Sequence, residues 1–169
     1  MATEAKYSVV IDMPVDQAWN KLRDLSQAHH YVPGLTRTEM TTEARECVGA
    51  SRRVYGRQSG MKVEMDETVT QWRDGSGFRI RLHKGEKSAP PFKDGWFDYS
   101  VAAEGDKTHL TCVLGFTMPG GPLAGLFEKL LKPIIAGSVR QVALSLKHWY
   151  ETGTKPTDAD RRRLRQQGF

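Results

Sequence analysis

The stretch Pro122–Glu151, near the C-terminal end, constrains the fold of this chain more than any other part. Its apolar residues recur every three or four positions, the spacing of an amphipathic helix. They are Leu123, Leu126, Phe127, Leu130, Leu131 and Ile134, followed by Ile135, Val139, Val142, Leu146 and Trp149. Pro133 and Gly137 lie where the apolar stripe changes direction, so we expect one bent helix or two helices end to end. Such a helix needs a sheet to pack against.

Most of the chain before this helix alternates apolar and polar residues, which is typical of strands. The first predicted strand is Lys6–Asp12, and two short helical segments follow it, one after Pro14 and one over residues 28–32. Further strands are predicted at residues 35–44, 50–57, 62–72, 78–83, 96–102 and 110–118. This order is that of an α+β domain. We expect a curved antiparallel sheet of about six to seven strands around the long C-terminal helix.

Several short motifs give the chain a family resemblance. They are Val9–Pro14, Ala18-Trp19, Leu22–Asp24, Val32-Pro33-Gly34, Val48–Arg52, Glu67–Trp72, Gly105–Thr108 and Leu146-Lys147. On these motifs, from about Tyr7 to Glu151, the sequence resembles the START-like (SRPBCC) helix-grip superfamily, and within it the polyketide cyclase/dehydrase and lipid-transport group. The resemblance implies a helix-grip fold. It selects no single activity, because the superfamily includes cyclases, lipid and quinone carriers, hormone receptors and co-chaperones.

The distribution of charge divides the chain into two parts. We expect a single helix-grip domain over residues 1–153 and a basic C-terminal tail over residues 154–169. The tail carries five cationic and two acidic residues, and thus +3 of the total net charge of +5, so we expect no nucleic-acid groove across the domain. Because its apolar residues are only Ala159, Leu164 and Phe169, the tail is predicted to be mobile or a loosely attached helix. Membrane contact through the tail is a lesser alternative.

No sequence motif calls for a metal or another cofactor. The five histidines form no His-Glu-x-x-His pattern, and Gly120-Gly121 lacks the Lys-Ser/Thr that completes a P-loop. Two cysteines are too few for a disulfide framework, and the first residues show no apolar signal segment. We therefore expect a cytoplasmic protein without metal or nucleotide. The oligomeric state stays open.

The candidate site is an apolar cavity between the sheet and the long helix. Adjacent residues on a strand face opposite ways, so either Arg52 or Arg53 is expected to point inward, with Glu67 as its partner. Of the two we place Arg53 in the binding site. The predicted ligand-binding residues are Arg53, Glu67, Ile80, Leu82, Tyr99, Leu114, Phe116, Phe127, Leu131 and Ile134. The loop over residues 84–94, with Pro90-Pro91, is predicted to form the mouth.

Three classes of function fit this sequence. The first is binding or transport of a small hydrophobic ligand, the second a polyketide cyclase- or dehydratase-like enzyme acting on an apolar substrate, and the third a protein-interaction, co-chaperone-like module. An enzyme needs a polar group with a perturbed pKa in the cavity, whereas a carrier needs shape and one orienting contact. An interaction module would have a collapsed cavity and an exposed apolar patch. No catalytic residue can be assigned from the sequence.

Overall fold

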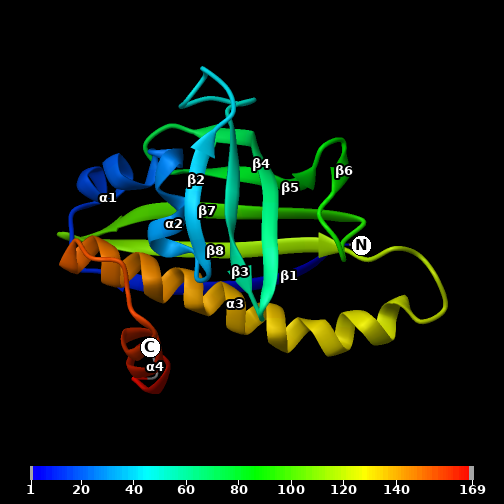
Figure 1. Ribbon diagram of the computed structural model, residues 1–169. Coiled ribbons are helices and arrows are strands. Elements are labelled where there is room, and N and C mark those ends of the chain that lie inside the picture. The colour runs from blue at the N-terminus through cyan, green and yellow to red at the C-terminus, as the bar shows by residue number, and fades with distance from the viewer. Residues whose placement is uncertain (1, 168–169) are drawn as a thin grey trace.

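The computed structural model describes residues 2–167 and contains one curved antiparallel sheet (Figure 1). Its strands are β1 (Thr3–Ile11), β2 (Leu35–Met40), β3 (Ser51–Gln58), β4 (Met61–Arg73), β5 (Gly77–Lys84), β6 (Lys87–Ser88), β7 (Asp94–Glu104) and β8 (Lys107–Thr117). Their order across the sheet is β1-β8-β7-β5-β4-β3-β2, and the short β6 pairs with β5. The predicted α+β helix-grip fold is confirmed. The sequence did not predict β6, which lies in the loop before β7.

The helices also follow the predicted order. The first predicted short helix is α1 (Val15–Leu22); a 3₁₀ turn, η1 (Leu25–Gln27), and the one-turn helix α2 (Ala28–Tyr31) make up the second segment. The long helix α3 (Ala124–Thr152) continues through Pro133 and ends at Gly153, which adopts the left-handed conformation favoured at helix C-termini. A last helix, α4 (Asp158–Gln166), follows it. Within the described residues, no helix is long and apolar enough to cross a membrane.

The two halves of α3 have different surroundings. Ile135, Val139, Val142, Leu146 and Trp149, in the second half, are all buried against the sheet and the short helices. In the first half, Leu123, Leu126, Phe127, Leu130 and Ile134 are all more than half exposed. Figure 1 shows the yellow first turns of α3 extending past the tip of the β3–β4 hairpin. The second half of α3 therefore supplies the core.

A close backbone approach fixes the start of β2 beside the end of β3. A Cβ atom on Gly56 would lie 2.1 Å from the carbonyl oxygen of Gly34, which is closer than any side chain allows. Gly34 itself has a φ of +86°, a conformation that glycine adopts without strain. This contact positions Val32, Pro33 and Gly34 at one edge of the cavity described below.

The tail forms more contacts than the sequence predicts. Thr157 caps α4 in a capping box with Asp160, and the Leu164 side chain is only 8% exposed. The Arg140 guanidinium donates to the carbonyl oxygen of Arg165 at 3.2 Å, and Lys155 Nζ donates to that of Leu35 at 2.6 Å. The tail is thus a capped helix with specific contacts. Its predicted residue Phe169 lies outside the described residues.

Candidate functional site

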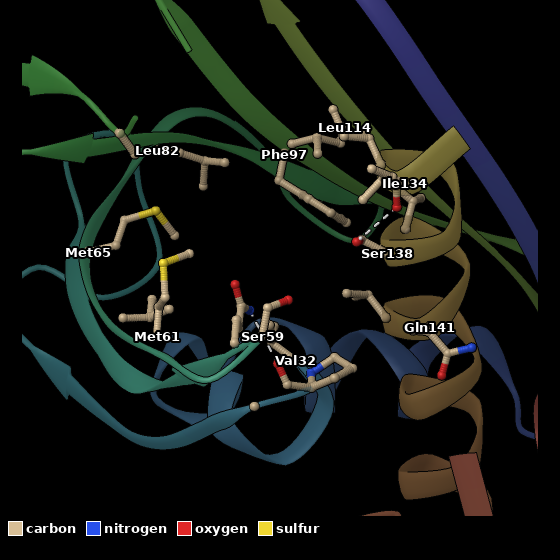
Figure 2. Close-up of a pocket in the computed structure, with 18 of the residues that line it drawn as sticks. Val32, Ser59, Met61, Met65, Leu82, Phe97, Leu114, Ile134, Ser138 and Gln141 are labelled. Carbon is tan, nitrogen blue, oxygen red and sulfur yellow. Dashed lines mark hydrogen bonds between the residues drawn. The ribbon is translucent and has the colours of Figure 1, made fainter. Parts of the chain in front are cut away.

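A cavity of about 1190 Å³ lies between the inner face of the sheet and α3. In Figure 2, Met61 and Met65 of β4 face Ile134 of α3 across the open space, and Leu82, Phe97 and Leu114 form a third side. The apolar lining residues are Val32, Pro33, Met61, Val63, Met65, Leu82, Ala89, Pro90, Pro91, Phe92, Phe97, Leu114, Ile134, Ile135, Val139 and Val142. A large, mainly apolar concave site of this kind is the usual form of a small-molecule pocket.

One wall of the cavity holds a buried group of polar side chains, which we call the polar cluster: Arg52, Glu67, Tyr31 and Tyr99. Arg52 is 1% exposed, and its Nε donates to Glu67 Oε2 at 2.5 Å. Arg52 Nη1 donates to the carbonyl oxygen of Leu25 at 2.7 Å and to the Tyr31 hydroxyl at 3.1 Å. A buried charge is tolerated only when paired in this way. Arg52 Nη2 is buried and has no hydrogen-bond partner in the described part of the chain.

The polar cluster meets the cavity through Glu67 and Tyr99, which both line it. Burial disfavours the charge on Arg52, but the Glu67 carboxylate, Tyr31 and Tyr99 together outweigh this effect and raise the pKa of the guanidinium. Burial also raises the pKa of Tyr99 well above its ordinary value, so its hydroxyl stays protonated and can donate a hydrogen bond. The cluster therefore offers a ligand both a donor and an acceptor.

The prediction that Arg53 lies in the site is wrong. Arg52 shares the inner face of β3 with Val54, whereas Arg53 points outward and forms a two-pronged ion pair with Asp66 at 2.6 and 3.2 Å. This outer pair is partly open to water, since the Arg53 side chain is 41% exposed. The hydrogen bond from Arg53 lowers the pKa of Asp66. The expected ion pair with Glu67 exists, but its arginine is Arg52.

Only some of the residues predicted to bind the ligand line the cavity. The structure places five of them at the cavity: Glu67, Leu82, Tyr99, Leu114 and Ile134. Ile80 and Phe116 lie on the inner face as predicted, but both are only 1% exposed and neither lines the cavity. Phe92 packs on Phe116 with ring centroids 5.0 Å apart and itself lines the cavity. Phe116 is therefore part of the core behind it.

Two predicted residues of α3 also lie away from the cavity. Phe127 is 52% exposed, because the first half of α3 extends beyond the strands that form the walls. Leu131 is partly buried and packs against the core on the same helix face as Ile135. The cavity meets α3 only from Ile134 to Val142.

The sequence prediction missed the β3–β4 hairpin as a wall. Met61, Val63 and Met65 alternate along β4 on the same face as Glu67, and all four line the cavity. That spacing of two was the available signal, since residues two apart on a strand share a face. Ala89–Phe92, within the loop predicted to form the mouth, also lines the cavity.

No metal centre is evident in this site. Among residues 2–167, no group of three or more histidine, cysteine or acidic side chains is placed to hold an ion. Besides the polar cluster and the apolar walls, the lining includes the charged residues Arg57, Lys62, Glu64, Lys84, Arg140 and Arg165.

The sequence pattern identifies the family. A sequence model of the family described as polyketide cyclase / dehydrase and lipid transport matches residues 2–151. The chain belongs to this family. The matched range ends before α4. No curated protein matches the chain significantly in sequence.

Solved structures show the same fold at low sequence identity. TTHA0849 from Thermus thermophilus is 20% identical, with a TM-score of 0.69 over 88% of this chain and 97% of that chain. The Zhui aromatase/cyclase from Streptomyces sp. R1128 is 12% identical, with a TM-score of 0.66 over 90% of this chain and 98% of that chain. Ginseng major latex-like protein 151 from Panax ginseng is 12% identical, with a TM-score of 0.63 over 88% and 97%. Family and fold together support a hydrophobic-ligand-binding or polyketide cyclase-like role.

Proposed function

We propose that this family member binds a small, mostly apolar molecule in the cavity and orients it through one polar group. The observation that carries the proposal is a mainly apolar cavity of about 1190 Å³ with a buried polar cluster in its wall. Pockets for drug-sized molecules are typically about 300–1,000 Å³ and combine apolar walls with a few placed polar groups. The Tyr99 hydroxyl would donate to an oxygen of the ligand, and Glu67 would accept from a ligand hydroxyl.

A cyclase- or dehydratase-like enzyme is the second candidate, and the polar cluster favours it. A protonated hydroxyl held in an apolar cavity can stabilise negative charge that develops on a carbonyl oxygen. Tyr99 meets this condition because burial keeps it neutral. The two candidates differ in what the Tyr99→Phe variant does to a co-purified compound: a carrier loses affinity, whereas an enzyme keeps the compound and loses its conversion.

The third candidate, a protein-interaction module, is favoured less. It predicts a collapsed cavity together with an exposed apolar patch; the first half of α3 does expose apolar residues, but the space between the sheet and α3 is open. We therefore place small-molecule binding first.

Two neighbouring residues of β8 allow a direct test of ligand binding. Leu114 lines the cavity, whereas Val113 lies on the opposite face of the same strand. We expect Leu114→Trp to weaken binding of the fluorescent probe 1-anilinonaphthalene-8-sulfonate about tenfold or more, because its indole takes up space in the cavity. Val113→Trp is the matched control and should leave binding unchanged. Native mass spectrometry of the parent protein should show a co-purified apolar compound.

The opposite result would describe a packed core. If the parent binds no probe and Leu114→Trp lowers the free energy of unfolding by about 1–3 kcal/mol, the residue is overpacked rather than placed in free space. Ligand binding in this cavity would then be rejected.

A further inference from the structure

The first half of α3 carries an apolar surface with no partner in the described chain. Leu123, Leu126, Phe127, Leu130 and Ile134 are 58%, 56%, 52%, 60% and 65% exposed. Their spacing places them on one helix face, and they span eleven residue steps, or about 17 Å at 1.5 Å per residue. We call this face the apolar stripe. A contiguous exposed patch of large apolar side chains usually marks an interaction surface.

The apolar stripe leads directly into the cavity. Ile134 belongs to both, since it lines the cavity and ends the stripe. Phe127 and Leu130 lie two turns and one turn before it on the same helix face. Across the opening, Met61 lines the cavity and is 71% exposed (Figure 2). A molecule leaving the cavity on this side would therefore pass between apolar side chains.

Cationic side chains outnumber carboxylates in this region, where Glu64 also lines the cavity and Glu128 precedes Lys129. Arg57, Lys62 and Lys84 line the cavity, and Lys129 lies on α3 between Leu126 and Leu130 in sequence. None of these four has a carboxylate within 4.0 Å among residues 2–167, although several other cations of the chain do. Exposed apolar side chains next to unpaired lysines and arginines are typical of surfaces that lie in the interface of a membrane with anionic lipids.

We propose that the apolar stripe docks on the surface of a lipid bilayer that contains anionic headgroups, with the cavity opening toward the acyl layer. The purpose of this contact rests on the proposed function, because it would let an apolar ligand pass between membrane and cavity without crossing water. A second copy of the chain fits the surface less well. In a two-fold dimer the same patch faces itself, so one surface with an excess of cations would face another.

The test is flotation of the full chain with vesicles of phosphatidylcholine alone and with added phosphatidylglycerol. We expect binding to the anionic vesicles and much less to the neutral ones. The double variant Leu126→Glu and Leu130→Glu should lose binding about tenfold or more. Val10→Glu with Val48→Glu is its matched control, because it makes the same charge change at two exposed valines that do not line the cavity.

A second pair of variants tests the role of charge. Lys62→Glu with Lys129→Glu should weaken binding to anionic vesicles at least about fivefold. Arg162→Glu with Arg163→Glu makes the same charge change on the tail and should have little effect. If the tail variant loses binding and the Lys62 and Lys129 variant does not, the contact belongs to the tail and the proposal is wrong.

Further outcomes would also overturn it. One is equal flotation of the parent chain and of the Leu126→Glu, Leu130→Glu double variant. Another is no flotation of the parent chain. A third is a dimer of the parent chain in light scattering that the double variant dissociates. Probe fluorescence measured on the same samples keeps the two proposals apart. A chain that binds the probe but not vesicles refutes only membrane docking, and one that binds vesicles but no probe refutes only the cavity ligand.

Discussion

At the scale of single residues, β3 and β4 carry two arginine–carboxylate pairs one position apart. Arg52–Glu67 lies on the inner face with side chains 1% and 6% exposed, and Arg53–Asp66 lies on the outer face with side chains 41% and 13% exposed. The chemistry is the same and the surroundings differ. Water screens the outer pair, whereas the inner one depends on its protein partners for the whole of its solvation.

This difference predicts unequal effects of removing each carboxylate. We expect Glu67→Ala to lower the free energy of unfolding by about 3–5 kcal/mol, because it leaves the Arg52 charge buried without a counterion. Asp66→Ala is the matched control and should cost about 1 kcal/mol or less. Urea unfolding followed by circular dichroism measures both. Equal losses in the two variants would show that Arg52 finds another partner or water.

At the scale of elements, α4 lies beyond the residues that the family model matches. The family match ends at residue 151, and the core consists mainly of the sheet, the short helices and α3, with Leu164 of α4 packed into it. The main apolar contribution of α4 is Leu164. Burying one leucine contributes about 1.5–3 kcal/mol, and ordering the segment offsets much of this.

We therefore predict that a chain truncated after Gly153 still folds. Its free energy of unfolding should fall by no more than about 2 kcal/mol, since the lost contacts are those of Leu164 and Pro156, the partly buried hydrogen bond from Lys155 to Leu35 and a few exposed hydrogen bonds. Thermal unfolding of the truncated and full-length chains measures the difference. A truncated chain without a cooperative transition would show that α4 is integral to the domain.

At the scale of the whole molecule, stability should depend on pH through the region where α2 meets α3. The His30 ring stacks on Trp149 with centroids 5.1 Å apart. Burial lowers the pKa values of both His29 and His30 below their ordinary 6.5. The neighbouring His30 and Lys155 lower the pKa of His29 further. Lys155 also lowers the pKa of His30, whereas Asp24 raises it. Above pH 6.5 both rings are mostly neutral in the folded and unfolded states. As the pH falls through 6.5, the unfolded chain takes up protons first, so stability decreases.

The predicted result is a lower melting temperature at pH 5.5 than at pH 7.5. His30→Phe keeps a ring against Trp149 and removes the titrating group, so the decrease should be smaller in this variant. Differential scanning calorimetry at the two pH values provides the comparison. An identical decrease in the parent and the variant would assign the effect to other groups.

The sequence by itself determined the architecture. The alternation along the strands and the helical spacing of residues 122–151 are local periodicities, and each dictates which residues share a face. These patterns predicted the element order, the antiparallel sheet and the role of the second half of α3 in the core. The same logic identified Leu82, Tyr99 and Leu114 as inward-facing residues, all of which line the cavity.

Only the tertiary structure decided what covers each face. Alternation requires that Arg52 and Arg53 point in opposite directions, but the curvature of the sheet and the position of Glu67 place Arg52 inside. The helical stripe of α3 is equally apolar at Phe127 and at Val139, yet only Val139 has the sheet beneath it. Burial depends on where one element ends relative to another, and periodicity within a single element carries no information about that distance.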